Sequence, residues 1–436
     1  MPYRKIVEEI KEQYLADNRP WVVGFSGGKD STCLLQLVFY ALQELPKEKL
    51  TKEVHVLCND TLVENPMIVD FVSGQMERIQ IYAEKSGLPI KTATVYPKLQ
   101  DTFWVNLIGR GYPSPNRWFR WCTERMKISP TSTYIMEQVS KYGEVIILLG
   151  TRKAESQNRK KSMEDYEAKN TRLRRHVLPG AFVFAPIAEL TTNDVWVYLM
   201  QVPSPWNGNT RQLVTLYRNA GGGECPLVID INTPSCGNSR FGCWTCTVVD
   251  RDKSLECLID NTGEERFYPL IKFRDYLHKI RDLPEKRESI RRNGLPGMGP
   301  FKIETRKEIL TKLLQASKDA ELSLISKDEL AAIQVLWYYD GAMNNDVEEI
   351  YYRIFQEEAT FMQTQTRVKI QEDREILKNI CENNGVDSDF LHSLIAIEEN
   401  NQMYLRRPNI FENLKLHIDT HFKKVETLQN IASEKA

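Results

Sequence analysis

The residues best suited to chemistry in this sequence are Ser26-Gly27-Gly28-Lys29-Asp30-Ser31, near the start of the chain. A buried strand is predicted before them, in WVVGF, and a helix after them, in STCLLQLVFYALQEL. A glycine turn at that junction leaves backbone N–H groups free and adds the positive end of a helix dipole. Lys29 places a point charge nearby, so a polyphosphate is the expected ligand. The glycine spacing differs from a Walker A loop, and an ordinary Gly-Gly turn is the alternative.

Four cysteines lie close together in the sequence: Cys225, Cys236, Cys243 and Cys246. Four thiolates from one loop-rich segment can enclose one metal centre. Zinc and a four-iron, four-sulfur cluster both accept such ligands, but the uneven spacing of 10, 6 and 2 intervening residues departs from a zinc ribbon. The neighbouring Trp244 favours a cluster shielded from water. Zinc, unligated packed thiols and a redox pair at Cys243 and Cys246 are the alternatives.

A separate cysteine, Cys122, lies between Arg120, Arg125 and Lys127 in the segment FRWCTERMK. Nearby cations favour the thiolate, which is the nucleophilic form and the form that can carry a persulfide sulfur. We therefore predict a catalytic thiol at Cys122. A packed, inert cysteine beside solvated charges is the alternative.

Basic residues also follow the apolar run VIILL. Arg152 and Arg159, at the carboxyl edge of a predicted strand, are candidates for holding the anionic oxygens of ATP. A wider basic set is a candidate footprint for the phosphate backbone of a nucleic acid, although interspersed acidic residues make a solvated face the alternative. The candidate phosphate ligands are Arg120, Arg125, Lys127, Arg172, Arg174 and Arg175.

The elements that must position these residues read as an α/β fold. The apolar runs WVVGF, VHVLC, IKTATVY and VIILLG alternate with helical segments, as in a parallel sheet wound with crossovers. The second run ends at Asn59-Asp60, on the edge where such sheets bind ligands, so Asp30 and Asp60 are candidates for Mg²⁺ or the ribose. We predict a nucleotide domain at 1–219, a loop-rich iron–sulfur lobe at 220–300 and a helical C-terminal region at 301–436.

The composition restricts the class of protein. The chain has 436 residues, of which 42% are hydrophobic and 27% are charged, and its net charge is −1. The start, MPYRKIVEEIKEQYL, predicts a charged amphipathic helix rather than a signal peptide, and no apolar run reaches spanning length. Nine cysteines without a secretory signal favour thiol or metal chemistry in a reducing cytoplasm. A nucleic-acid partner would need a local basic patch or another subunit.

The motifs SGGKDS, FRWCTERMK and LGTRKAESQNR together resemble the 3′-phosphoadenylylsulfate reductase branch of the PP-loop ATP pyrophosphatases. Longer strings are similar to the DndC family of DNA phosphorothioation proteins, among them CNDTLVENP, LMQVPSPWNGN and LYRNAGGGECPLVIDINTPSCGNSRFGCWTCTVVDRDKS. The similarity runs from about Asp17 to about Lys307. The helical region after about Leu310 resembles the family only in its general composition and helical pattern.

This resemblance implies an enzyme that binds ATP at Ser26–Ser31 with Mg²⁺, releases pyrophosphate and helps to replace a non-bridging oxygen of DNA by sulfur. It also implies a 4Fe-4S cluster on the four clustered cysteines, DndD-like and DndE-like subunits, and a cysteine desulfurase of the DndA or IscS type as sulfur donor. Cys122 matches the cysteine of the RWCT element. Cys381 lies alone in KNICENNG, so no adenylylsulfate-reducing cysteine is expected. A homologue acting in single-stranded phosphorothioation, a PP-loop tRNA thiolase and a non-catalytic iron–sulfur scaffold are the alternatives.

Overall fold

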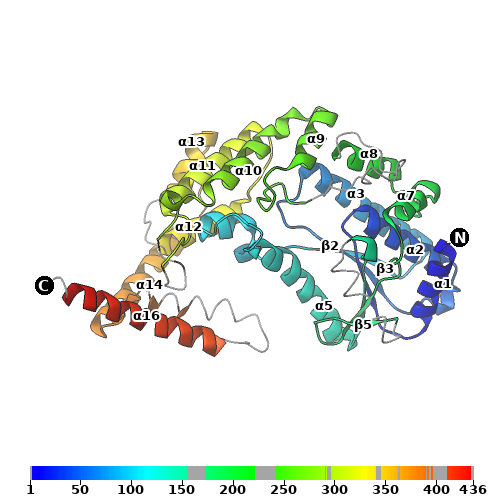
Figure 1. Ribbon diagram of the computed structural model, residues 1–436, viewed down its shortest axis with the longest axis horizontal. Helices are drawn as coiled ribbons and strands as arrows, with labels where there is room; N and C mark the ends of the chain where they lie inside the picture. The colour runs from blue at the N-terminus through cyan, green and yellow to red at the C-terminus, as the bar shows by residue number, and fades with distance from the viewer. Residues whose placement is uncertain are drawn as a thin grey trace. The chain divides into compact units, whose positions relative to one another are not determined.

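A computed structural model describes residues 2–155, 172–220, 242–289, 291, 296–339, 345–361, 364–388, 390–391, 394–395 and 410–433. The chain forms two compact units. The first comprises Met1–Phe103 with Pro115–Asp275, and the second comprises Trp104–Ser114 with Tyr276–Ala436. Figure 1 traces both units along the chain. The predicted regions 1–219, 220–300 and 301–436 divide the chain elsewhere and remain a prediction.

The first unit contains a six-stranded sheet in the order β3-β2-β1-β4-β6-β5. Neighbouring strands are parallel except for β5, which pairs antiparallel with β6. All four strands predicted from the apolar runs are present, so the predicted parallel α/β fold is confirmed. The strands are β1 (Trp21–Gly24), β2 (Val54–Asn59), β3 (Ile90–Val95), β4 (Val145–Leu148), β5 (Arg174–Arg175) and β6 (Ala181–Phe184).

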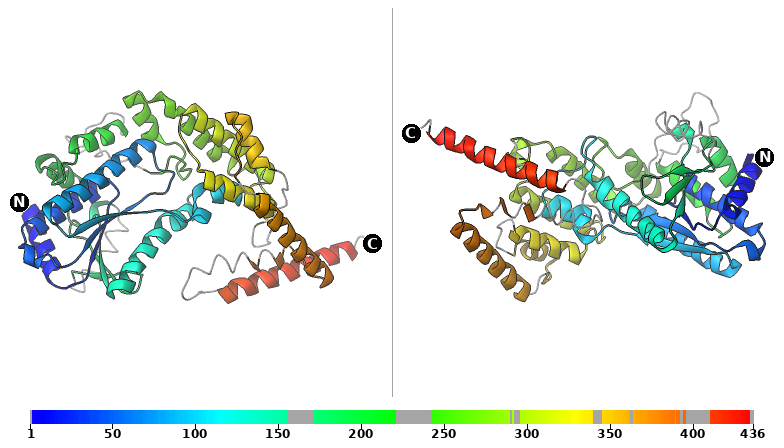
Figure 2. Two further views of the ribbon diagram at one scale, coloured as in Figure 1. Left: turned by 180° about the vertical axis from the view of Figure 1, so that it is seen from behind. Right: turned by 90° about the horizontal axis from the view of Figure 1, so that it is seen from below.

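Helices cover both faces of this sheet (Figures 1 and 2). Because side chains alternate along a strand, Ile146 and Leu148 of β4 join the larger core, while Val145 and Ile147 pack with Ile135 of α5 (Ser129–Tyr142) on the other face. The helices that contribute to the larger core are α1 (Pro2–Leu15), α2 (Lys29–Gln43), α3 (Pro66–Ser86), α7 (Thr192–Gln201) and α8 (Thr210–Ala220). The first unit also contains α4 (Trp121–Thr123), a π-helical turn at Glu124–Ile128 and α9 (Lys253–Thr262).

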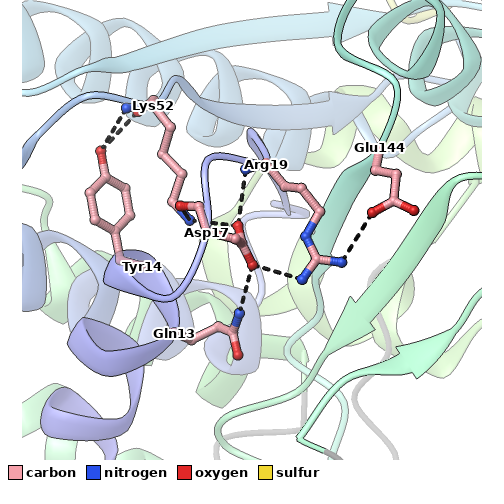
Figure 3. Close-up of polar contacts among 6 residues, drawn as sticks. All are labelled: Gln13, Tyr14, Asp17, Arg19, Lys52 and Glu144. Carbon is pink, nitrogen blue, oxygen red and sulfur yellow. Dashed lines mark hydrogen bonds and ion pairs between the residues drawn. The ribbon is translucent and has the colours of Figure 1, made fainter.

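A buried ion pair fixes the amino ends of the central strands (Figure 3). Lys52, with 3% of its side chain exposed, donates from Nζ to the main-chain oxygen and to Oδ1 of Asp17 at 3.1 and 3.2 Å. Asp17 also accepts from Arg19, which bonds Glu144 just before β4. Tyr14 donates to the main-chain oxygen of Lys52 at 2.9 Å. These contacts tie α1 to the sheet at the end opposite the glycine-rich loop.

The second unit is helical, as predicted for the C-terminal region, and it incorporates a segment from the middle of the chain. Trp104 Nε1 donates to the carbonyl of Leu324 at 2.6 Å, and Trp337 Nε1 donates to the carbonyl of Ile108 at 3.0 Å. The unit contains a π-helical turn at Val105–Gly109, the C-terminal end of α10 (Tyr268–Ile280) from Tyr276 onward, and α11 (Ile303–Asp319), α12 (Lys327–Tyr339), α13 (Asp346–Phe355), α14 (Thr364–Asn383) and α16 (Ile410–Ser433). No helix in the described ranges is long and apolar enough to cross a membrane.

Candidate nucleotide and cysteine site

The glycine-rich loop connects β1 to α2 and is held in shape by its own serines. Gly28 is the N-cap of α2 with an extended backbone, and its carbonyl accepts from Ser31 Oγ at 3.0 Å. Ser31 Oγ also accepts from the backbone N–H of Ser26 at 3.2 Å. The hydroxyl of Ser31 therefore closes the loop over the first turn of the helix. The positive end of the helix dipole at this N-terminus suits an anionic group.

Gly27 is required by the conformation and by the packing. Its φ of +69° lies in the left-handed region, and an added Cβ would lie 2.5 Å from Cγ2 of Val72 on α3. Gly28 is less tightly packed than Gly27, since a Cβ added there would lie 3.3 Å from the hydroxyl of Tyr217. The phenol of Tyr217, on α8, accepts from the backbone N–H of Lys29 at 3.3 Å. The turn thus needs its first glycine because no larger side chain fits between β1 and α3.

Asp30 lies between two cations. Its Oδ1 accepts from Arg152 Nε at 2.7 Å, and its Oδ2 lies 3.2 Å from Lys29 Nζ. Arg152 is 2% exposed and also donates to the carbonyl of Leu190 at 3.3 Å. The structure therefore brings together three of the predicted catalytic residues. It places the Asp30 carboxylate where it neutralises and orients Arg152, in addition to the Mg²⁺ or ribose role predicted for it.

A cavity of about 520 Å³ opens beside this loop. It lies at the carboxyl ends of β1, β2, β3 and β4. The chain order runs outward from β1 through β2 and β3 on one side and through β4 and β6 on the other, so the sheet has a switch point beside β1. Such a switch point is where open α/β sheets bind ligands. One wall is apolar and suits an adenine ring, with Leu57, Ile68, Val69, Val72 and Met76. The polar part of the lining includes Ser26, Asp30, Ser31, Asn59, Asp60, Glu64 and Lys127.

Asp60 enters the cavity as predicted from its place after β2. Burial raises the pKa of its carboxyl group, the Glu64 carboxylate raises it further, and the hydrogen bond from the backbone N–H of Leu62 opposes both. No cation of the described chain forms an ion pair with Asp60. A metal ion or a ribose hydroxyl in the cavity would compensate this carboxylate.

The second predicted motif meets the same cavity through the loop that follows β2. Glu64 forms an isolated antiparallel bridge with Cys243, and the backbone N–H of Trp244 donates to the carbonyl of Val63 at 3.0 Å. Cys243 Sγ lies 3.3 Å from Thr61 Oγ1 and 3.7 Å from Glu64 Oε1. Burial raises the pKa of Cys243 to about 12, as expected for a thiol without a metal. The cysteine segment therefore packs against the rim of the cavity.

Lys127, four residues after the RWCT element, contacts Glu64 at this rim. Its Nζ lies 3.1 Å from Glu64 Oε1. Burial acts to lower the pKa of Lys127, but the Glu64 carboxylate and the thiols of Cys243 and Cys122 outweigh it and raise the pKa. Lys127 is therefore a permanent cation between the cavity and the cysteines.

Cys122 lies beside the cysteine segment rather than apart from it. Burial raises its pKa, and the neighbouring Cys246 raises it further. The expectation that flanking cations create a thiolate is wrong in this arrangement. Lys127 acts in the expected direction, but the guanidinium of Arg125 is paired with Asp101, and burial prevails.

The predicted phosphate ligands Arg172, Arg174 and Arg175 do not line the cavity. Arg172 pairs with Glu9 and Glu12, and Arg174 and Arg175 form β5 at the far edge of the sheet. Arg159, Cys225 and Cys236 lie outside the described residues, so a four-cysteine site remains a prediction. Among the residues that are described, no three His, Cys, Asp or Glu side chains are arranged to hold a metal ion.

Two residues at the site were missed by the sequence analysis. Glu64 lies within the string CNDTLVENP, and its position six residues after the end of the predicted strand VHVLC could have indicated a place at the ligand edge. Tyr217 gives no local signal, because its contact with Lys29 spans 188 positions.

Comparison with known proteins agrees with this geometry. The family model of the phosphoadenosine phosphosulfate reductase domain matches residues 20–249, which span the sheet, the cavity and the described part of the cysteine segment. The chain belongs to this family. An uncharacterised protein of Methanocaldococcus jannaschii is 27% identical over 247 residues, which are 57% of this chain and 40% of that protein. The chain therefore spans less than half the length of the curated relative it matches.

Two solved structures are similar at low sequence identity. The phosphoadenylyl-sulfate reductase of Candida auris, in a phosphate complex, is 13% identical with a TM-score of 0.30, covering 46% of this chain and 81% of that one. The U34-tRNA thiolase NcsA of Methanococcus maripaludis, with its [4Fe-4S] cluster, is 12% identical with a TM-score of 0.31, covering 64% and 80% respectively.

Proposed function

We propose that this phosphoadenosine phosphosulfate reductase-domain protein is an ATP pyrophosphatase and sulfurtransferase of the DndC type, acting in DNA phosphorothioation. One observation carries the proposal. The glycine-rich loop lines the cavity through Ser26, Asp30 and Ser31, and the cysteine segment contacts Glu64, which lines the same cavity. Activation of a phosphate by ATP and delivery of sulfur both need to occur at one centre, and this cavity is large enough for a nucleotide.

The chain's own residues divide the work of binding ATP. The backbone N–H groups at the start of α2 and the Lys29 ammonium would hold the phosphates that leave as pyrophosphate. Asp30 keeps Arg152 and Lys29 oriented, since it bonds both. The apolar wall of the cavity would hold the adenine, and Asp60 would bind Mg²⁺ or the ribose.

The donors available suit the two further groups that the proposal requires. Mg²⁺ prefers carboxylate oxygens, and Asp60 supplies one that is partly desolvated and has no cationic partner among the described residues. Mg²⁺ would neutralise the departing pyrophosphate. Cys225, Cys236, Cys243 and Cys246 would hold a 4Fe-4S cluster, whose soft iron prefers thiolate ligands.

The reaction is a double displacement at phosphorus. A non-bridging oxygen of a DNA phosphate attacks the α-phosphorus of ATP, which forms the adenylylated diester and releases pyrophosphate. A cysteine desulfurase would supply the sulfur as a persulfide on Cys122. A dithiol reductant would convert it to hydrosulfide, being oxidised to a disulfide and leaving Cys122 as a thiol, and the hydrosulfide then attacks the DNA phosphorus. The new P–S bond forms as the P–O bond to AMP breaks, and the proton passes to solvent. Lys127 and Arg120 would neutralise charge on the phosphorus centre, and Cys122, beside Cys246, would carry the sulfur.

Nuclease digestion and mass spectrometry of DNA test this proposal, using a deletion strain complemented with this gene and with DndD-like and DndE-like partners. We expect phosphorothioate dinucleotides with the wild-type gene. The second candidate is a PP-loop tRNA thiolase, which the same cavity and cysteines would also serve. Loss of tRNA thionucleosides on deletion, with DNA sulfur unchanged, would favour the thiolase.

A further inference from the structure

Trp118, four residues before Cys122, is a solvent-exposed tryptophan at the tip of a hydrogen-bonded turn. The side-chain Oδ1 of Asn116 accepts from the backbone N–H groups of Trp118 and Phe119, both at 2.8 Å, and the N–H of Asn116 donates to the carbonyl of Phe119 at 3.3 Å. Such an Asx turn fixes the backbone without help from the core. Trp118 at its tip is 95% exposed, and Phe119 is 43% exposed. A large aromatic ring held in water on a fixed backbone is typical of a binding surface.

The charges around this turn are unmatched. Arg117 and Arg120 flank the two aromatic residues, and both are exposed. Within the described residues, neither guanidinium forms an ion pair. By contrast, Arg125 is paired with Asp101, and Lys127 is paired with Glu64. The sequence Arg117-Trp118-Phe119-Arg120 thus places two free cations on either side of two exposed rings.

The turn is anchored to the cysteine segment. Thr247 Oγ1 donates to the carbonyl of Pro115 at 2.7 Å, just before the turn, and Thr247 directly follows Cys246 in the chain. Four residues of chain reach at most about 14 Å, which bounds the distance between the Cα atoms of Trp118 and Cys122. A ligand on Trp118 is therefore one or two nucleotides away from Cys122.

We propose that Trp118 stacks on an unpaired base of the DNA strand that is presented to the cysteine site, while Arg117 and Arg120 hold the phosphates on either side of that base. This inference rests on the proposed function. A nucleic-acid strand alternates a flat, apolar base with an anionic phosphate, and the turn alternates rings with guanidinium groups. A base inside a duplex offers no free face, so the strand must be single or the base must be extruded at this point.

Fluorescence anisotropy of the full-length protein tests the inference, with labelled oligothymidylate, a DNA duplex of equal length and oligouridylate at one fixed ionic strength. We expect oligothymidylate to bind more tightly than the duplex. Trp118→Ala should weaken that binding roughly 5- to 150-fold, the range of one base–aromatic stack, and Trp118→Phe should restore most of it. Arg117→Gln and Arg120→Gln should each reduce the slope of log affinity against log salt by roughly 0.7.

Phe411→Ala is the matched control, because Phe411 is an 85% exposed aromatic on α16 of the second unit. It should bind DNA as the wild type does, and thermal melts should show that both alanine variants are folded. Equal affinity of Trp118→Ala and wild type would overturn the inference, as would tighter Trp118-dependent binding of oligouridylate or of duplex. Pyrophosphate release from ATP by the wild type separates the two proposals. If it is present while Trp118→Ala binds normally, only this inference fails, and if it is absent, the proposed function fails.

Discussion

Replacing Asp30 with alanine should lower the free energy of unfolding of the first unit and should also abolish activity. Arg152 is 2% exposed, and its Nε lies 2.7 Å from Asp30 Oδ1, so Asp30→Ala removes a carboxylate that bonds a buried guanidinium. Lys29 is different. Its ammonium lies 3.2 Å from Asp30 and 18% of its side chain is exposed, so water can solvate it when its partner is removed.

The magnitude follows from the burial of each partner. Removing one partner of a buried pair costs about 3–5 kcal/mol, and the 21% exposure of the Asp30 side chain places this case near the lower end, at about 3 kcal/mol. Lys29→Ala should cost less, about 1 kcal/mol, because Asp30 keeps its bond to the buried Arg152. Arg152→Met in the Asp30→Ala background removes the buried charge and should recover about 1–2 kcal/mol.

Urea unfolding followed by circular dichroism measures these differences in the free energy of unfolding. The two single variants and the double variant form one series with the wild type. If Asp30→Ala unfolds within about 0.5 kcal/mol of the wild type, the Arg152–Asp30 pair does not bear on stability, and the reasoning from burial is refuted. A double variant less stable than Asp30→Ala would contradict the explanation from the buried charge.

Three further outcomes are expected. Gly27→Ala should weaken ATP binding about tenfold or more in calorimetry, because φ is positive there and the new Cβ would meet Val72, and an unchanged affinity would contradict the loop geometry. Asp17→Asn should destabilise the fold by about 2 kcal/mol at neutral pH, where Arg19 and Lys52 outweigh burial and hold the pKa of Asp17 below its usual value. That difference should vanish as pH falls through the folded-state pKa, since a lowered carboxyl pKa stabilises only above the unfolded value of about 3.9, and a difference independent of pH would refute it. Cys243→Ser should lose iron from anaerobically purified brown protein, and Cys122→Ser should keep iron but lose DNA sulfur, whereas equal iron loss would make Cys122 a ligand.

The sequence predicts the sheet and the loop because their signals are local. The strand before Ser26, the glycine that permits a positive φ and the helix after it all lie within about twenty residues, and the apolar runs alternate with helical segments in the chain order of the fold. The same locality places Asp60 at the ligand edge, and the structure confirms that it lines the cavity.

The partners of these residues could not be predicted in the same way. Asp30 meets Arg152 across 122 positions, and Glu64 meets Cys243 across 179 positions. Such pairs depend on how crossovers and loops pack, for which a single sequence carries no periodic signal. The error about the Cys122 thiolate has this origin, since burial and the approach of Cys246 are both long-range effects.

The central claim is that this cavity activates DNA with ATP for sulfur transfer, and DNA sulfur in cells carrying wild-type or Lys29→Ala protein tests it most directly. The account predicts phosphorothioate dinucleotides with the wild type and none with a folded Lys29→Ala protein, because Lys29 supplies the charge at the pyrophosphate site. Normal DNA sulfur with Lys29→Ala, or DNA without sulfur in cells carrying the wild type and its partners, would contradict it.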